Sequence, residues 1–286
     1  MTVSNPTLAL ADYPHDALSA AMGRVRDFRY HPDPLGDPFA RNVIAAEYKK
    51  SGTDVSPGDI ALTASTSEAY GLLFKLLCNP EDAVLVPVPS YPLFDFLAKL
   101  ECVQTVPYRM LYDGSWYLDI EDLRAKISGR TKAVVIVNPN NPTGSFLKPA
   151  ERRALAELAS KYSLPVICDE VFLDYPLAEA ARGGTLVGSG APLTFCLNGL
   201  SKMAGMPHLK LGWIVLDGDK AKVRAARDRL EFILDTYLSV NLPVQSALSD
   251  LLAVGDEIRA KLLARIRSNF AFLKAELTAS AVHVLT

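Results

Sequence analysis

The sequence lacks most of the features that mark secreted, membrane-bound or metal-binding proteins. Its four cysteines are scattered without a CxxC pair, and its four histidines show no ligand spacing, which argues against a disulfide framework and a zinc site. No stretch approaches the ~20 apolar residues of a membrane span, and the first residues lack the charged and apolar regions of a signal peptide. We therefore expect a soluble, cytoplasmic protein without bound metal and without a membrane partner.

A strong net charge is missing as well. The chain carries 30 lysines and arginines and 32 acids, which gives a formal charge of −2 and a pI near 6.1. This balance argues against a general nucleic-acid binder. What the chain does have is a length of 286 residues, of which 49% are hydrophobic. That is enough for one large domain, or for one large domain plus a smaller piece.

Short β-branched runs alternate with amphipathic segments along most of the chain. This pattern is typical of an α/β domain in which helices cover a buried, mainly parallel sheet. We expect strands at 83–88, 103–107, 132–138, 165–169, 193–197 and 211–216, and helices at 38–50, 66–78, 92–100, 119–128, 149–162 and 219–236.

The last 45 or so residues differ from the rest, because their apolar residues follow a long 3.6-residue period from Leu251 to Leu273. Residues 282–286 then resemble the start of a β-rich segment that has no partner strand after it. The chain also begins abruptly, in a loop rich in proline and asparagine. We expect the chain to be the core of a longer protein.

Two polar motifs follow apolar strands, at the sheet edge where α/β folds place ligands. Residues 138–144, NPNNPTG, combine stiffening prolines with short amides, although a shorter version would be an ordinary turn. Asp169 lies within CDEVF, where an acid could also simply cap a helix. These motifs predict a ligand at the carboxyl ends of the strands.

Two lysines flank the loop between the last two expected strands. Lys202 follows Ser201, and Lys210 opens the run LKLGW. A lone lysine is usually solvated surface, but this pair could serve a covalent bond and a phosphate separately. Residues 64–69, ASTSEA, lead into a helix N-terminus, where backbone N–H groups and hydroxyls favour an anion. A simple N-cap is an equally natural interpretation, and both can hold together.

Taken together, NPNNPTG, CDEVF and NGLSK…LKLGW resemble, in order and spacing, the fold-type I pyridoxal-phosphate enzymes and specifically the class I and II aminotransferases. The resemblance extends from about Asn5 to the end of the chain. It implies a three-layer α/β/α fold with a seven-stranded, mainly parallel sheet that contains one antiparallel strand. It also implies an N-terminal segment (1–29), a large cofactor-binding domain (30–240), and interdomain helices with the start of an incomplete small domain (241–286).

The resemblance also implies a role for each motif. Lys202 would form the Schiff base with pyridoxal 5'-phosphate and would move the substrate's α-proton. Asp169 would pair with the pyridine nitrogen, and Asn141 would hydrogen-bond the cofactor's phenolic oxygen. Tyr91 matches the aromatic residue that stacks on the ring, although packing under the next helix is the alternative. The phosphate would be bound by Ser65, Thr66, Ser67, Ser201 and Lys210, and by Tyr30 from the partner subunit of a homodimer.

The sequence departs from the family pattern at three points. Lys210 stands in place of the usual phosphate arginine, which keeps the charge but loses bidentate geometry. Phe172 replaces a tyrosine that donates to the phenolic oxygen in many relatives, and Tyr175 is near it in sequence. No residue matches the small-domain arginine that binds the substrate's α-carboxylate in relatives, so cofactor binding is expected to survive better than efficient transamination.

The function implied is transfer of an amino group from an amino acid to a 2-oxo acid, with no nucleic-acid partner. Carbon–sulfur lyases and some decarboxylases use the same lysine, aspartate and asparagine, so these reactions stay open. A different alternative is a truncated cofactor-binding or dimerising core with little catalysis.

Overall fold

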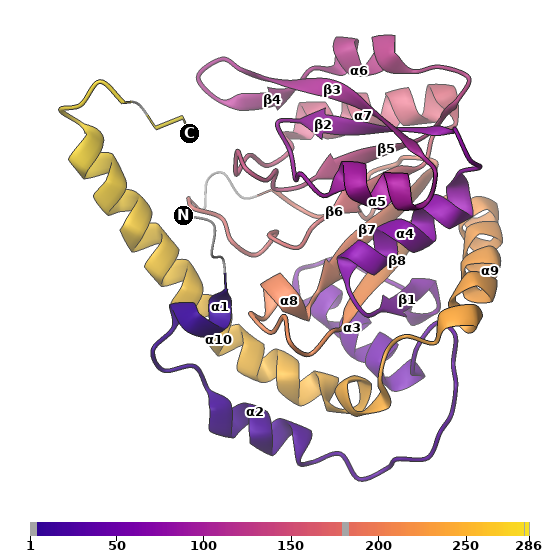
Figure 1. Ribbon diagram of the computed structural model, residues 1–286, viewed down its shortest axis with the longest axis vertical. Helices are drawn as coiled ribbons and strands as arrows, with labels where there is room; N and C mark the ends of the chain where they lie inside the picture. Colours follow the sequence, from indigo (N-terminus) through magenta and orange to yellow (C-terminus); the bar gives the residue numbers. More distant parts are fainter. Residues whose placement is uncertain (1–4, 179–182, 283, 286) are drawn as a thin grey trace.

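The computed structural model describes residues 5–178, 183–282 and 284–285. Within these residues, strands form one mixed sheet of eight in the order β1-β8-β7-β6-β5-β2-β3-β4 (Figure 1). Their bounds are Ile60–Thr63 (β1), Ala83–Val88 (β2), Gln104–Tyr112 (β3), Trp116–Leu118 (β4), Thr131–Val137 (β5), Val166–Asp169 (β6), Leu193–Gly199 (β7) and Gly212–Gly218 (β8).

The strand directions match the α/β/α fold that the motifs implied. Neighbouring strands from β7 through β3 run parallel, and β8 is antiparallel to both β7 and β1. These seven strands therefore contain one antiparallel member, as expected. The list of expected strands did not include β1, and it also missed an eighth strand, β4, which pairs antiparallel with β3. Because β4 has only three residues, it has too few positions for a recognisable alternation.

Helices cover both faces of this sheet. Proline at the first helical position helps to fix the start of α3 and of α7, which were predicted correctly at both ends. The helices are Pro6–Ala9 (α1), His15–Met22 (α2), Pro38–Lys50 (α3), Thr66–Leu77 (α4), Phe94–Leu100 (α5), Ile120–Lys126 (α6), Pro149–Tyr162 (α7), Leu200–Met203 (α8), Lys220–Tyr237 (α9) and Leu242–Leu277 (α10), with a short 3-10 turn at Pro57–Asp59 (η1).

The alternation of side chains along β5 shows how the two core layers form. Val134 and Ile136 pack in one layer with residues of α3, α7 and α10, whereas Val135 and Val137 pack in the other layer with residues of α4, α5 and α9. The chain is thus a three-layer α/β/α domain.

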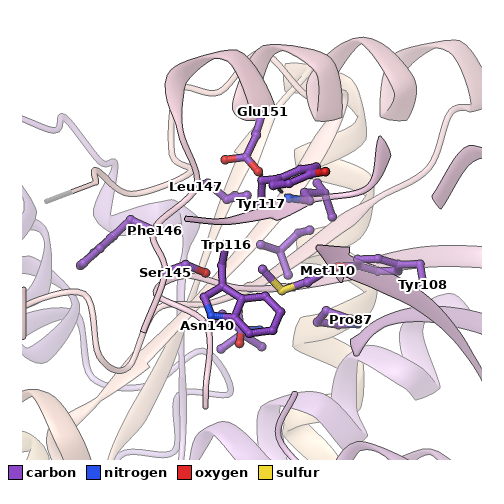
Figure 2. Close-up of a pocket in the computed structure, with 13 residues that line it drawn as sticks. Pro87, Tyr108, Met110, Trp116, Tyr117, Asn140, Ser145, Phe146, Leu147 and Glu151 are labelled. Atoms are coloured by element: carbon purple, nitrogen blue, oxygen red, sulfur yellow. Dashed lines mark hydrogen bonds between the residues drawn. The ribbon is translucent and has the colours of Figure 1, made fainter. Parts of the chain in front are cut away.

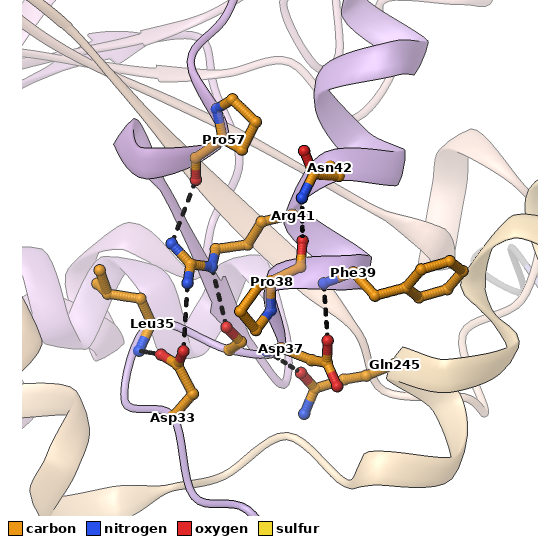
Figure 3. A network of polar contacts seen from close by, with 10 residues as sticks. Asp33, Leu35, Asp37, Pro38, Phe39, Arg41, Asn42, Pro57 and Gln245 are labelled. Atoms are coloured by element: carbon orange, nitrogen blue, oxygen red, sulfur yellow. Dashed lines mark hydrogen bonds and ion pairs between the residues drawn. The ribbon is translucent and has the colours of Figure 1, made fainter. Parts of the chain in front are cut away.

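A polar network holds the segment before α3 (Figure 3). The Arg41 guanidinium donates to the Gly36 carbonyl across 2.9 Å and to the Asp33 carboxylate across 3.2 Å. The Asp37 N–H donates to the side-chain oxygen of Gln245 across 2.6 Å, so the segment is also tied to α10. This network fixes the chain between the irregular residues 23–34 and the sheet.

The C-terminal part of the chain is dominated by α10, a single helix of 36 residues. Val282, Val284 and Leu285 have no regular structure, and His283 and Thr286 lie outside the described residues, so the strand expected at 282–286 is not found at the described positions. The division into 1–29, 30–240 and 241–286 stays a prediction. Among the helices described, none is long and apolar enough to cross a membrane.

Candidate active site

The carboxyl ends of β5, β6 and β7 bring the predicted motifs to one edge of the sheet. Val137 pairs with Asp169, and Asp169 pairs with Leu197. Beyond these pairs, the Asn138 N–H donates to the Asp169 carbonyl across 2.8 Å, so the loop 138–144 begins directly beside Asp169. Lys202 follows five residues after Leu197. The parallel register therefore gathers three motifs that lie far apart in the sequence.

The Asp169 carboxylate is buried at the end of β6. The Tyr70 hydroxyl donates to one carboxylate oxygen and the Val171 N–H to the other, each across 3.2 Å. Burial raises the pKa of Asp169 to about 6, although both hydrogen bonds and the positive charge of Lys202 act against the rise. No ion pair to Asp169 forms within the described residues, so its carboxylate is suited to a buried cationic partner.

Lys202 lies on the short helix α8 and lines a cavity of about 320 Å³ together with Phe172, Tyr175 and Ser201. The Tyr175 hydroxyl donates to the main-chain carbonyl of Lys202 across 2.7 Å. Phe172 packs edge-to-face on Tyr175, with ring centroids 6.4 Å apart. The Tyr175 hydroxyl is thus engaged with the backbone and does not stand in for the hydroxyl that Phe172 lacks.

Close backbone packing fixes the start of α8. A Cβ on Gly199 would lie 2.8 Å from the Cα of Gly212, so the two strands approach more closely there than a side chain allows. Gly205, just after α8, has a φ of +65°, and a Cβ there would lie 2.7 Å from a methyl group of Ile258. Glycine is required at both points, and together they seat α8 between the sheet and α10.

The N-terminus of α4 combines a helix cap with uncommitted hydroxyls. The Glu68 N–H donates to the Ser65 side chain across 3.1 Å, and the Ala64 N–H donates to the Glu68 carboxylate across 2.6 Å. Ser65 therefore acts as the N-cap. The half-buried side chains of Thr66 and Ser67 form no hydrogen bond within the described residues. They present two hydroxyls at the positive end of the helix dipole.

Two strand pairings bring the remaining predicted phosphate residues toward this helix. Gly212 pairs with Thr63 on β1 and with Gly199 on β7, so the segments that follow these strands start from one corner of the sheet. Ser201 and the exposed Lys210 both lie within three residues of these pairs. Lys210 has a φ of 52°, in the left-handed region that few L-residues adopt.

Tyr91 packs next to the aromatic residues that support Asp169. Its ring lies edge-to-face against Phe94 at 5.8 Å, and Phe94 lies 5.2 Å from the ring of Tyr70. Burial raises the pKa of Tyr91, and the negative charge of Asp169 raises it further. Tyr91 is therefore within electrostatic reach of Asp169, as a ring-stacking residue has to be.

Within the loop 138–144, Asn140 and Asn141 behave differently. The buried Asn140 side chain donates to the Pro89 carbonyl across 3.3 Å and accepts from the Thr143 hydroxyl across 2.9 Å. It therefore joins this loop to the segment that carries Tyr91. Asn141 is half-buried, and its amide forms no hydrogen bond with the described part of the chain. Asn141 is thus the amide left free for a ligand.

A second cavity lies on the outer side of this loop, between the β3–β4 hairpin and α7 (Figure 2). The Glu151 carboxylate accepts from the Leu118 N–H across 2.5 Å and from the Lys148 N–H across 2.7 Å, which ties the hairpin to the start of α7. The cavity measures about 10 Å³, close to the minimum for one water molecule. It serves as packing around the loop 138–147 and is too small for a cofactor.

Tyr30 lies apart from these residues. It is 76% exposed and lines a different cavity, of about 210 Å³, with residues 31–34, 36–37 and 238–242. Among the described residues, Tyr30 and Lys202 line different cavities. Its predicted contact with a partner's cofactor stays a prediction.

Two functional neighbours were missed by sequence analysis. Tyr70 reads as one more apolar position of α4, and nothing in its context indicates that its hydroxyl reaches Asp169. Glu170 is fully buried, and its carboxylate accepts from the Leu186 N–H and the Thr185 hydroxyl, each across 2.7 Å. The sequence did contain a signal for Glu170. Successive side chains of an extended chain point to opposite faces of the sheet, so Glu170 is expected on the face opposite to that of Asp169.

The residues present fit pyridoxal phosphate. Asp169 is a buried acid without a paired cation, Thr66 and Ser67 offer uncommitted hydroxyls at a helix N-terminus, and Lys202 opens into a cavity. A cationic ring nitrogen, a phosphate and an aldehyde are the groups that such residues recognise. These residues at the carboxyl ends of the strands of a three-layer α/β/α domain define a fold-type I aminotransferase domain.

Comparisons with known proteins agree with this class. The family model for aminotransferase class I and II matches residues 5–286. The glutamate-pyruvate aminotransferase AlaA of Escherichia coli (strain K12) is 30% identical over 253 residues, which cover 88% of this chain and 62% of that protein. The alanine aminotransferase structure from Pyrococcus furiosus has a TM-score of 0.82 and 28% identity, covering 96% of this chain and 70% of that one. The chain belongs to the aminotransferase class I and II family, whose members are generally pyridoxal-phosphate-dependent.

A further relative, the alanine aminotransferase of Mycobacterium tuberculosis (strain H37Rv), is 31% identical over 227 residues, which cover 76% of this chain and 51% of that protein. The chain thus spans less than two thirds of the length of these curated relatives, 62% in the case of AlaA.

Proposed function

We propose that this protein is a pyridoxal-phosphate-dependent aminotransferase that moves an amino group from an amino acid to a 2-oxo acid. The observation that carries the proposal is the pair formed by Asp169 and Lys202. Asp169 is a buried carboxylate whose pKa is raised to about 6, and the charge of Lys202 acts on it from the neighbouring strand end. A buried acid with a raised pKa close to a lysine is typical of a functional site. A cofactor with a cationic ring nitrogen and an aldehyde would engage both residues.

When bound, pyridoxal phosphate supplies an electron-withdrawing ring that stabilises negative charge on the substrate's α-carbon. Asp169 would hold a proton at the ring nitrogen, and Tyr70 and Val171 orient the Asp169 carboxylate for that task. Lys202 would hold the cofactor covalently through its Nζ atom and, once released, would carry the α-proton on the same atom.

The remaining predicted residues would orient the cofactor. Asn141 is the free amide for the phenolic oxygen, and Tyr91 and Phe172 are the aromatic residues for the ring. The phosphate residues would be Ser65, Thr66, Ser67, Ser201 and Lys210. Because Lys210 is a point charge and lacks a guanidinium fork, we expect weaker phosphate retention than in relatives with arginine.

We also propose that the protein is a cytoplasmic homodimer in which Tyr30 completes the partner's phosphate site. The support is the exposure of Tyr30, at 76%, in an extended segment next to Phe28, which is 71% exposed. Sedimentation analysis of the protein with and without pyridoxal phosphate tests the dimer. Tyr30→Phe should weaken cofactor retention without changing the mass of the assembly if the contact exists.

The choice of reaction rests on the relatives. Proteins named glutamate-pyruvate and alanine aminotransferase are among the curated matches, which favours transamination over carbon–sulfur elimination or decarboxylation. Alanine with 2-oxoglutarate is therefore the first pair of substrates to try. A cofactor-binding core with little catalysis stays the second candidate, because the chain spans only 62% of AlaA.

The test starts with pyridoxal phosphate alone. The protein should gain the visible absorbance band of covalently bound cofactor, and Lys202→Ala should not, whereas Lys161→Ala, an exposed lysine of α7, should behave as the wild type. Addition of alanine and 2-oxoglutarate should then yield glutamate and pyruvate. With cysteine in place of alanine, formation of hydrogen sulfide, ammonia and pyruvate without glutamate would indicate elimination. A band that no amino acid alters would indicate a binding core. No band at all overturns the proposal.

A further inference from the structure

The cavity around Lys202 has an uneven lining. Most of its wall is apolar, with contributions from Pro6, Ala9, Phe172, Leu262 and Ile266. Its charged lining residues are both cations, Lys202 and Arg265, and no acidic side chain of the described residues lines it. A cavity of this kind favours an anionic ligand that also carries an apolar group.

Arg265 is a cation of this cavity that forms no ion pair with a carboxylate of the described residues. Its guanidinium donates one hydrogen bond to the Ala9 carbonyl. Arg259, on the same helix, differs, because it pairs with Asp256 across 2.7 Å and with Asp174 across 3.8 Å. Arg265 thus keeps N–H donors for a ligand.

The packing of α10 on α8 fixes where Arg265 stands relative to Lys202. A Cβ on Gly255 would lie 2.6 Å from the Cβ of Ala204, and Ile258 packs against Gly205 just after α8. Arg265 follows Ile258 by seven residues, which is two helical turns, so both lie on the same face of α10. Figure 1 shows α1, α8 and α10 meeting at this point. The cavity is therefore lined by residues of α1, α8 and α10 together with the loop after β6.

We infer that Arg265 binds the carboxylate of the substrate, and that the apolar wall formed by Phe172, Leu262 and Ile266 receives its side chain. The amino donors would then be amino acids with uncharged, apolar side chains. This inference rests on the proposed function and names its substrate class. A guanidinium binds a carboxylate through two parallel hydrogen bonds, which fixes orientation as well as affinity. The absence of acids on the described wall disfavours cationic side chains.

Binding of a simple carboxylate to the cofactor-free protein tests Arg265 without any turnover. Calorimetry should detect 4-methylpentanoate binding to the wild type, and the affinity should fall about 10- to 100-fold in Arg265→Met, the range for a hydrogen bond to a charged group. Arg265→Lys should fall between the two. Uncharged 4-methylpentanamide should bind all three proteins equally. Arg229→Met, an exposed residue of α9 on the other face of the sheet, should match the wild type.

The loaded enzyme separates this inference from the proposed function. Arg265→Met should raise the KM for leucine about 10- to 100-fold, while its reaction with isoamylamine, the amine that corresponds to leucine without its carboxylate, stays as in the wild type. If the wild type turns over leucine and Arg265→Met keeps both its KM and its carboxylate affinity, the inference is wrong and the function stands. If lysine or aspartate is preferred to leucine, the substrate class is wrong. A wild type that never transaminates but shows Arg265-dependent carboxylate binding contradicts only the function.

Discussion

The phenol of Tyr175 donates a hydrogen bond of 2.7 Å to the main-chain carbonyl of Lys202. This bond joins the loop after β6, which carries Phe172, to the helix that carries Lys202. Burial raises the pKa of Tyr175 to about 12, so the phenol stays a donor throughout the neutral range. Tyr175 is thus a positioning residue for the backbone at Lys202.

Replacing Tyr175 with phenylalanine should remove this bond while keeping the edge-to-face packing on Phe172. The Lys202 carbonyl keeps a second donor, the Gly205 N–H at 3.2 Å, so the loss of stability should be about 1 kcal/mol in urea unfolding. Tyr162→Phe, at the end of α7, is the matched control. The visible band with pyridoxal phosphate should persist in Tyr175→Phe. Its loss at unchanged stability would mean that the phenol contacts the cofactor.

Mutations should distinguish two roles at the start of α4, helix capping by Ser65 and phosphate binding by Thr66 and Ser67. Ser65→Ala removes the N-cap and should lower stability by about 1 kcal/mol even without phosphate. Thr66→Val and Ser67→Ala remove hydroxyls that form no hydrogen bond with the described residues, so they should leave unfolding unchanged and weaken pyridoxal-phosphate retention instead. Urea unfolding of the apoprotein and dialysis of the loaded protein provide the two measurements. Equal effects of all three substitutions on stability would contradict this division.

Much of the fold could be predicted from local patterns. The helices that became α3 and α7 were bounded correctly, since proline marks each start. Apolar runs revealed the central strands because they are buried on both faces. That the sheet contains one antiparallel strand followed only from the family resemblance, and the order of the strands was not predicted. Strand β4 could not be predicted, because three residues are too few to show the alternation of apolar and polar side chains that indicates a strand.

The sequence motifs were sufficient to predict that Asn141, Asp169 and Lys202 follow or end neighbouring buried strands, and their roles toward a cofactor stay a prediction. The site was not predictable where a contact depends on the crossing of distant elements. Tyr70 meets Asp169 because α4 packs over the end of β6, and its neighbours in sequence give no sign of this. Arg265 lines the cavity because α10 passes beside α8. From the sequence of α10 alone, Arg265 would be expected on a solvent-exposed face of the helix.

The α8–α10 contact predicts a steric test. In Gly255→Ala the new methyl group would lie 2.6 Å from the Cβ and 3.2 Å from the Cα of Ala204, so α10 has to shift away from α8. We expect a loss of about 1–3 kcal/mol in urea unfolding, the usual cost of overpacking. Gly129→Ala is the control, because no atom lies within 4 Å of a Cβ there. If both variants are equally stable, the close approach of the helices is wrong.

The buried Glu170 predicts a pH dependence of stability. Burial raises its pKa from 4.5 to about 7, although the hydrogen bonds from Leu186 and Thr185 act against the rise. The unfolded chain therefore loses this proton at a lower pH than the folded chain does. Protonated Glu170 contributes stability that is fully present below its unfolded pKa and is lost as the pH rises through about 7.

Glu170→Gln keeps the shape and cannot ionise, and the Thr185 hydroxyl can rotate to accept from the new amide. The variant should match the wild type near pH ~4 and become relatively more stable as the pH rises, by up to about 3 kcal/mol near pH ~8. Urea unfolding of both proteins across this pH range gives the difference in the free energy of unfolding. Glu157→Gln, which removes an exposed carboxylate, is the matched control. A difference that stays constant with pH would show that folding leaves the pKa of Glu170 unchanged, and one that shrinks as the pH rises would show that folding lowers it.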